Sequence, residues 1–171
     1  YSEEYLYGEG KKIIDKYTTS TVCMFRITNL EEINDTYSRK LGNQVVIDVS
    51  KFVENNISND YLFVRYMGPK FAIVFSGVDV ESVTTFVTDM KNGAEDIEIS
   101  LPLNNDVEEI EIEAIDRKKK KKKEKEPQIV KAKLNFVLTT YYKGTGIEEV
   151  LKKMEKHLDE ASKDESQINN I

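Results

Sequence analysis

"RYMGPKFAIVF", residues 65–75, is the stretch that decides the fold of this chain. It ends one apolar strand, turns at Gly68 and Pro69, and continues as a second strand of aromatic and β-branched residues. An enzyme built on such a hairpin would place acidic side chains at the turn, where this chain has Pro69 and Lys70. The hairpin therefore predicts a β-sheet, and it raises the question whether its turn carries any chemistry.

Helical and strand patterns alternate on both sides of this hairpin. Residues 29–32, "NLEE", match a capping box that would start a helix at Asn29. The expected helices cover 2–17, 29–37, 42–56, 79–90 and 146–161, with a break near Gly42, and the expected strands cover 20–27, the hairpin at 61–76, and 134–141. Alternating helices and strands predict an α/β fold in which helices pack on a mixed sheet.

Residues 97–133 interrupt this rhythm and predict an extended β-hairpin insertion, in which 107–115 pair with 129–137. Between these strands, residues 117–126 carry seven lysines and one arginine against two glutamates. A solvated loop is the favoured interpretation of such a run. The alternative is a binding site for an anionic partner, formed by Lys118, Lys119, Lys120, Lys121, Lys122 and Lys123. Because no aromatic residue interleaves with these lysines, a platform for single-stranded nucleic acid is not expected.

The composition fits one domain that occupies residues 1–163 and is followed by a frayed tail at 164–171. The chain has 171 residues and a formal net charge of −6, which gives no general attraction for DNA. Cys23, the only cysteine, is predicted to be a small buried hydrophobe. No apolar run approaches the ~18 residues of a membrane span. We expect a cytoplasmic domain that is fused to other domains in a larger protein, with a membrane-anchored protein as one option.

Three separated stretches resemble the GGDEF domain family, the diguanylate cyclases, which join two GTP molecules into cyclic di-GMP. The family pattern "DIDxFKxINDxYGHxxGDxxL" corresponds to "RITNLEEINDTYSRKLGNQVV" at 26–46, and "RYGGDEF" corresponds to "RYMGPKF" at 65–71. Residues 134–161 are similar to the closing strand, loop and helix of the family. The resemblance implies a GGDEF, palm-like fold: a mixed β-sheet sandwiched by helices, here with an extended β-hairpin insertion.

The resemblance also implies a metal site, whose ligand positions are substituted in this chain. In active members, the first aspartate of "DIDxF" and the third letter of "GGDEF" bind Mg²⁺. These positions are Arg26 and Pro69 here, and the whole signature reads Met67, Gly68, Pro69, Lys70 and then phenylalanine. Mg²⁺ requires oxygen ligands, preferably anionic ones, and neither residue supplies one. We therefore expect no metal site, no cofactor and no catalytic residue.

Part of the nucleotide pocket that the resemblance implies is retained. Family members hold guanine with the asparagine of "IND" and the aspartate of "GD", which correspond to Asn34 and Asn43. An amide oxygen can accept a hydrogen bond from a guanine edge. The alternative is that both asparagines only cap helices. The triphosphate-binding cations of the family fall at Ser162 and Ser166, and the arginine of its inhibitory "RxxD" product site is missing from "ISND" at 57–60.

The sequence therefore predicts a catalytically inactive GGDEF-like domain that acts in signalling or scaffolding, by binding a protein partner or a second copy of itself, or by regulating attached domains. A non-catalytic receptor for GTP or cyclic di-GMP, using Asn34 and Asn43, is the alternative. An active cyclase with displaced ligands is a remote third. His157, the only histidine, is expected to have no metal-binding or catalytic role.

Overall fold

A computed structural model describes residues 2–66, 68–102, 128–161 and 167–171. Met67, the lysines at 118–123 and the predicted strand at 107–115 lie outside these described residues. Among the helices that are described, none combines the length and the apolar character that a membrane span needs.

The centre of the domain is a five-stranded mixed sheet with the order β2-β3-β1-β4-β5. Its strands are β1 (Thr19–Ile27), β2 (Leu62–Arg65), β3 (Lys70–Phe75), β4 (Leu134–Tyr142) and β5 (Ile168–Asn170). β2 and β3 form the predicted hairpin, β1 pairs antiparallel with both β3 and β4, and β5 runs parallel to β4. β1 is therefore the middle strand and β2 lies at one edge.

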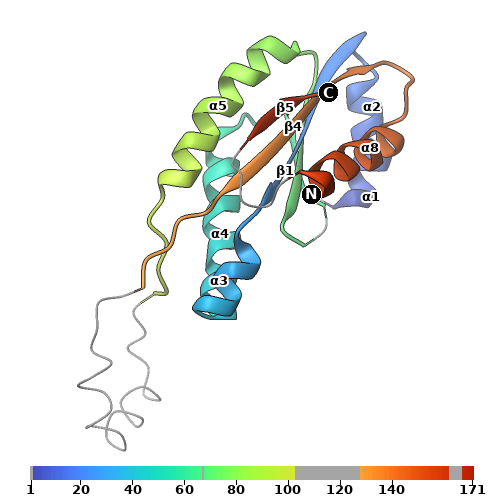
Figure 1. Cartoon of the computed structure of the whole chain (residues 1–171). Helices are drawn as coiled ribbons and strands as arrows, with labels where there is room; N and C mark the ends of the chain where they lie inside the picture. Colours follow the sequence, from blue (N-terminus) through green and yellow to red (C-terminus); the bar gives the residue numbers. More distant parts are fainter. Residues whose placement is uncertain (1, 67, 103–127, 162–166) are drawn as a thin grey trace, which may run out of the picture.

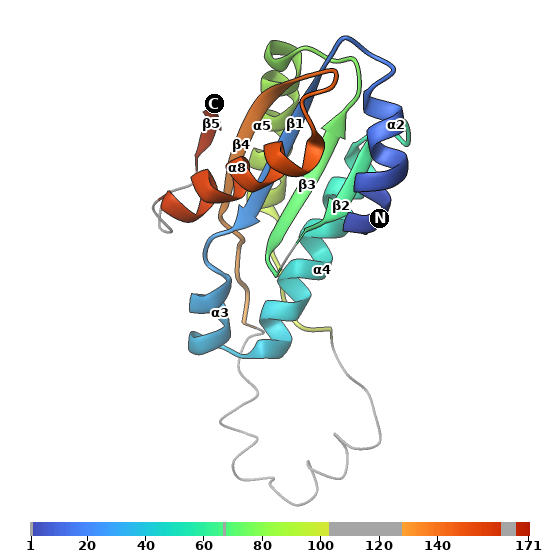
Figure 2. The same ribbon diagram turned by 90° about the vertical axis from the view of Figure 1, so that its right-hand side faces the viewer.

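Helices cover both faces of the sheet (Figure 1). The described helices are α1 (Glu3–Tyr5), the π-helical turn η1 (Leu6–Gly10), α2 (Lys11–Ile14), α3 (Leu30–Thr36), α4 (Arg39–Asn56), α5 (Val80–Asp96) and α8 (Ile147–Glu160). α4 and α5 lie on one face, while the N-terminal helical segment and α8 lie on the other (Figure 2). This α/β sandwich is the predicted fold class.

The alternation of β1 explains why both faces are covered. Cys23 and Phe25 belong to the apolar cluster under α4 and α5, whereas Val22 and Met24 belong to the cluster under α8 and the N-terminal segment. All four side chains are fully buried. A strand with apolar residues on both faces is stable only between two layers of helices, so the sequence of β1 already requires the sandwich. The prediction that Cys23 is a core residue is confirmed.

The prediction for the helices at 29–37 and 42–56, which correspond to α3 and α4, was wrong in two details. The helix break lies at residues 37 and 38, not at Gly42, because the Ser38 hydroxyl accepts a hydrogen bond from the Leu41 backbone N–H (3.1 Å) and starts α4 there. Asn29 precedes α3 as predicted, but its side chain makes no capping bond. The Asn29 amide instead binds the backbone at Lys131 and Lys133, at 2.9 Å each, and so ties α3 to the segment before β4.

The ends of the predicted insertion belong to the body of the domain. Ile99 and Val130 exchange two backbone hydrogen bonds of 2.9 Å, and both side chains lie in the core with Ala132. Val130 therefore pairs with Ile99, and Phe136 and Val137 pair with β1 on one side and with β5 on the other. The register predicted for 129–137 was therefore wrong. The alternating pattern at 129–137 arises because these residues enter β4 and pack against β1.

The tail was also mispredicted. Residues 168–170 form β5 on the free edge of β4, where the Phe136 N–H donates to the Gln167 carbonyl (2.8 Å) and the Ile171 N–H donates to the Leu138 carbonyl (2.9 Å). Ile168 packs against the core cluster under α4 and α5. An unpaired strand edge and two isoleucines are sufficient to order a segment that its polar composition marks as frayed.

Candidate functional site

An open pocket of about 730 Å³ lies where β1, the β2–β3 turn, α3, the start of α4 and the end of α8 meet. Beside Pro69, its lining has eight residues with charged or polar side chains, which are Arg26, Thr28, Glu31, Asn34, Asp35, Arg39, Lys70 and Asp159. Four residues that the sequence marked as site positions, Arg26, Asn34, Pro69 and Lys70, thus come together although they are far apart in the chain. Asn43 is not among the residues described as lining this pocket; it is exposed on α4.

The hairpin turn fixes two of these positions. Gly68 has φ +56°, a left-handed conformation that favours glycine. The next residue, Pro69, accepts a hydrogen bond from the Ile27 N–H at its carbonyl oxygen (3.1 Å), which attaches the turn to the end of β1. The β1–β3 register then places Lys70 directly opposite Arg26. The turn therefore brings two cations together at one end of the sheet.

Two carboxylates of α8 neutralise these cations. Asp159 Oδ1 lies 2.9 Å from Lys70 Nζ and 3.3 Å from Arg26 Nη1, and Glu155 Oε2 lies 3.5 Å from Lys70 Nζ. Arg26 Nη1 is also 3.4 Å from the Leu158 carbonyl oxygen. The side chains of Arg26 and Lys70 are only 11% and 15% exposed, so solvent screens these contacts incompletely. The result is a four-residue charge cluster, Arg26, Lys70, Glu155 and Asp159, that joins α8 to β1 and β3.

Arg26 opposes cation binding at this end of the sheet. Like charges directly opposite each other on neighbouring strands destabilise a sheet, and here the acids of α8 offset that repulsion. A further cation beside Arg26 would be repelled: two unit charges 4 Å apart near a protein surface cost about 4 kcal/mol, and a dication doubles this. No group of three or more His, Cys, Asp or Glu side chains within the described ranges is arranged to hold a metal ion.

Comparison with known families gives the same assignment as the sequence motifs. Residues 1–114 match the model of the family described as "Diguanylate cyclase, GGDEF domain". This match covers well over half of the chain. The chain belongs to the GGDEF family. Its fold is therefore that of the domains of cyclic di-GMP signalling.

Solved structures of GGDEF domains share the fold of this one at low sequence identity. The diguanylate cyclase SiaD of Pseudomonas aeruginosa, solved with its activator SiaC, superposes with a TM-score of 0.75 at 10% identity, over 99% of this chain and 58% of that chain. The coiled coil and GGDEF domain of DgcB from Caulobacter crescentus, solved with c-di-GMP, gives 0.74 at 14% identity, over 99% and 78%. The FimX GGDEF domain of P. aeruginosa gives 0.72 at 10% identity, over 100% and 94%. These likenesses concern the fold alone.

Curated relatives are longer proteins. Uncharacterized membrane proteins of Staphylococcus aureus, for example that of strain COL, are 23% identical over 93 residues, which is 54% of this chain and 26% of theirs. This GGDEF domain thus spans about a quarter of the length of those relatives.

Several of the positions that the sequence aligns with the GGDEF motifs lie in this pocket. Arg26 and Pro69, which the motif resemblance aligns with the two metal-ligand positions of the family, both line the pocket. Lys70, which replaces the last acid of the signature, is the residue that α8 binds most closely. Met67 and the phosphate-binding positions at 162 and 166 lie outside the described residues.

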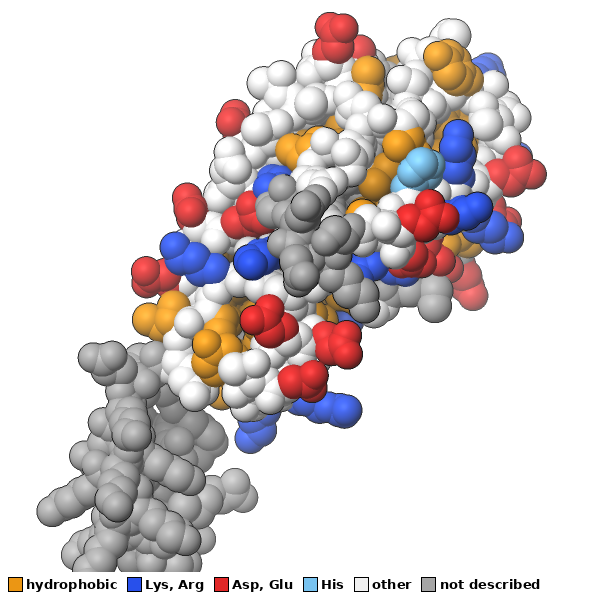
Figure 3. Space-filling model, in the orientation of Figure 1, with side chains coloured by type: hydrophobic (Ala, Val, Ile, Leu, Met, Phe, Trp, Pro, Cys, Tyr) orange, Lys and Arg blue, Asp and Glu red, His pale blue; other side chains and the backbone are white. Residues whose placement is uncertain are grey.

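Sequence reasoning missed Glu155 and Asp159. They are four residues apart on α8 and therefore lie on the same face of the helix. This spacing was the sequence feature that could have indicated a pair of acids acting together. Because α8 also carries many other charges, with acidic and basic side chains interspersed on its outer surface (Figure 3), the pattern alone did not single them out. Only the pairing of β1 with β3 shows which charges they meet.

Two ionisable groups near the sheet are unsuited to chemistry. Burial raises the pKa of the Cys23 thiol far above its ordinary value, so this cysteine stays protonated. Burial also raises the pKa of Tyr66, beside the hairpin turn, and its side-chain hydrogen bond with Tyr7 raises it further. His157 is exposed on α8. None of these residues provides an activated nucleophile or base to the pocket.

Asn34 is held in place by a glycine of the neighbouring helix. A Cβ atom at Gly42 would collide with Asn34 Oδ1, so α3 and α4 approach closely only because position 42 has no side chain. Asn34 Oδ1 is buried and has no hydrogen-bond partner among the described residues. The amide is therefore oriented by packing and not by a bond to the protein.

Replacing Gly42 by alanine should destabilise the domain. The new methyl group must displace the Asn34 amide, and overpacking typically costs about 1–3 kcal/mol, against a gain of about 1 kcal/mol in helix propensity. Urea unfolding should show a net loss of about 1 kcal/mol. Gly8→Ala, where nothing lies within 4 Å of the new Cβ, should be neutral or stabilising. Equal signs for the two variants would contradict the close contact.

Proposed function

We propose that this GGDEF domain does not cyclise GTP and that it acts as a regulatory domain through contacts with a protein partner, a second copy of itself or attached domains. The observation that carries the proposal is the charge cluster. Arg26 and Lys70 occupy signature positions where active members have acids, and Asp159 and Glu155 hold both side chains there.

The chemistry of cyclisation explains why these substitutions matter. In active members, Mg²⁺ bridges the phosphates of GTP and activates the 3′-hydroxyl, and it needs carboxylate oxygens for binding. Arg26 supplies a permanent positive charge and Pro69 has no side-chain ligand. Three carboxylates line the pocket, those of Glu31, Asp35 and Asp159. Asp159 is engaged with Arg26 and Lys70, and among the described residues no three acids are grouped so that they could hold a metal ion. The residues of this pocket therefore do not suit a bound divalent metal.

Product formation tests the proposal directly. The purified domain is incubated with GTP and Mg²⁺ or Mn²⁺, and the nucleotides are separated by chromatography. Formation of cyclic di-GMP at least about 10⁴-fold more slowly than by an active family member supports the proposal, and faster formation overturns it.

A nucleotide receptor is the second candidate function, and one observation favours it. Asn34, the guanine-binding position of the family, lines the same pocket as Arg26 and Lys70. The two cations could neutralise phosphates where active members use Mg²⁺, provided that the nucleotide displaces Asp159. Recognition of guanine by a neutral amide is weaker than by a carboxylate, and Asn43 does not reach the pocket.

Thermal melts distinguish this second function. With GTP at about 100 times its dissociation constant, the domain should gain roughly 2.7 kcal/mol, which raises the melting temperature by about 5–10 °C. The rise should persist in EDTA, because cations of the protein replace the metal. Asn34→Ala should abolish it, and Asn43→Ala should leave it unchanged. A flat melt with GTP, GDP, ATP and cyclic di-GMP would leave the domain without a nucleotide function.

A further inference from the structure

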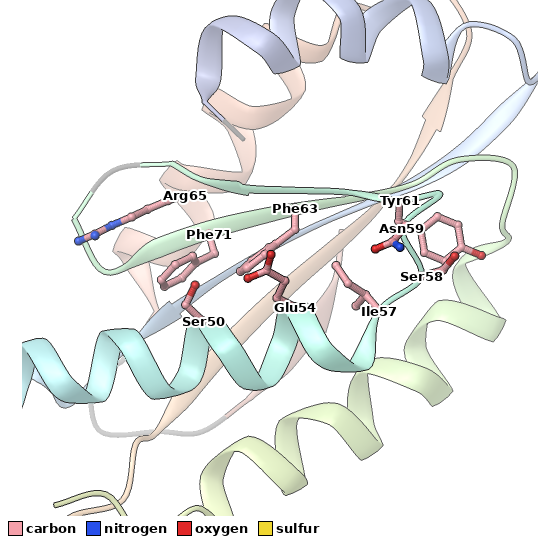
Figure 4. Close-up of a pocket in the computed structure, with 9 residues that line it drawn as sticks. All are labelled: Ser50, Glu54, Ile57, Ser58, Asn59, Tyr61, Phe63, Arg65 and Phe71. Atoms are coloured by element: carbon pink, nitrogen blue, oxygen red, sulfur yellow. The ribbon is translucent and has the colours of Figure 1, made fainter. Parts of the chain in front are cut away.

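The pocket lined by Arg26, Asn34 and Lys70 is called the signature pocket. A second pocket, distinct from it, lies between α4 and the edge strand β2 (Figure 4). It has a volume of about 390 Å³, within the size range of small-ligand sites. Side chains of β2 and β3, including Phe63 and Phe71, form its sheet side, and Ser50 and Glu54 reach into it from α4 (Figure 4). Its volume suits a single side chain of a partner protein.

The apolar wall of this pocket is the end of a row of stacked aromatic rings. Phe136 of β4, Phe25 of β1 and Phe71 of β3 follow one another with centroid separations of 4.7 and 5.1 Å. Phe63 continues the row on β2, 5.6 Å from Phe71 and tilted by only 23°. Among the described strands β2 lies at the edge of the sheet, and Phe63 is the member of this row that β2 contributes to the pocket lining. A planar group that enters the pocket can stack at this end of the row.

The opposite wall provides one carboxylate. Glu54 projects from α4 towards Phe63 (Figure 4), and it has no ion-pair or hydrogen-bond partner within residues 2–66, 68–102, 128–161 and 167–171. Arg65 lies at the far end, where its Nε donates to the Gly68 carbonyl oxygen (3.2 Å) and its side chain points away from Glu54. The middle of the pocket therefore combines an aromatic face with an acid that is available for a ligand.

We infer that this pocket binds an arginine side chain of a partner protein. A guanidinium group is planar, stacks on aromatic rings and pairs with a carboxylate through its fork of N–H groups, and it is more weakly hydrated than the ammonium group of lysine. Phe63 and Glu54 supply the stacking face and the carboxylate that this group requires. The hydroxyls of Ser50 and Ser58 add acceptors at the rim.

The edge strand favours a partner in extended conformation. Within the part of the chain that the structure describes, β2 pairs with β3 alone, so its other side offers backbone groups to an added strand. An extended segment along β2 would place one side chain in the pocket beside Phe63. The inference rests on the proposed protein-interaction function and names the chemistry that the partner must present.

The experiment uses three probes on isotope-labelled protein, followed by NMR chemical-shift changes. N-acetyl-arginine amide should give saturable shifts confined to the residues around Phe63 and Glu54, in the millimolar range for a single side chain. N-acetyl-citrulline amide, which has the same planar shape without the charge, should bind at least about tenfold more weakly. Glu54→Gln and Phe63→Leu should each weaken arginine binding at least about fivefold. Glu149→Gln, an exposed acid on α8, is the matched control and should change nothing.

Each alternative outcome overturns the inference. Equal binding of citrulline, or unchanged binding by Glu54→Gln, would remove the role of the carboxylate. Cyclic di-GMP, the third probe, would assign the pocket to a nucleobase if it shifted these residues and the arginine derivative did not. Thermal melts of every variant verify that it is folded. None of these results bears on cyclisation, so failure of the arginine site leaves the proposed lack of cyclase activity to its own assay.

Discussion

The purified domain, incubated with GTP and Mg²⁺, is expected to form cyclic di-GMP at least 10⁴-fold more slowly than an active diguanylate cyclase. Each preorganised electrostatic group is worth about 2.7–4 kcal/mol of transition-state stabilisation, or about 10²–10³ in rate. Arg26 and Pro69 replace two such groups at the metal site, which gives a combined loss of roughly 10⁴–10⁶. Lys70 adds a cation where the family has a further acid.

The control for this assay is an active family member measured in the same buffer, which shows that the conditions support cyclisation. A second control adds Mn²⁺ at millimolar concentration. Mn²⁺ binds carboxylate and nitrogen ligands more tightly than Mg²⁺ does, so it would fill a site that is too weak for Mg²⁺. Cyclic di-GMP formed less than about 10⁴-fold more slowly than by the active enzyme would show that other residues hold the metal. The proposed loss of activity would then be wrong.

Much of this fold could be predicted because its core elements carry strong local patterns. The turn at Gly68 and Pro69 and the alternation of β1 each fix a local structure without help from distant residues. The errors lie where a distant contact decides. Asn29 has the sequence of a helix cap, yet its amide binds the backbone at Lys131 and Lys133. Ile168 lies in a polar tail, yet the open edge of β4 recruits it.

In the candidate site, too, some features could be predicted from the sequence and others depend on distant contacts. The motif positions Arg26, Pro69 and Lys70 could be located from the sequence, since family spacing places them in one pocket. The neutralisation of Arg26 and Lys70 by acids of α8 could not, because α8 lies far along the chain, with Asp159 133 residues after Arg26, and presents several acids. Asn34 and Asn43 looked equivalent in sequence. They lie on two different helices, α3 and α4, which are separated by the break at residues 37 and 38. Of the two, Asn34 lines the pocket.

Reversing both central charges of the cluster should produce the largest loss of stability. The double variant Arg26→Asp, Lys70→Glu would leave four acids together, because Glu155 and Asp159 lose both of their cations. Breaking a buried ion pair from one side costs about 3–5 kcal/mol. Since Asp159 is half exposed, we expect the lower end, about 3 kcal/mol, in urea unfolding at low salt. Added salt should recover part of the loss.

The matched control is Lys40→Glu, Lys51→Glu, which changes the net charge equally at two exposed positions of α4 and should cost well under 1 kcal/mol. The reversed variant should also gain a property that the natural chain is not expected to have. Four carboxylates at the signature pocket form a set of oxygen ligands, so Mg²⁺ or Ca²⁺ should raise its melting temperature while leaving that of the natural chain unchanged. If both double variants lose the same stability, the contacts between α8 and the sheet do not hold the cations, and the argument for a lost metal site then rests on the substitutions at positions 26 and 69 alone.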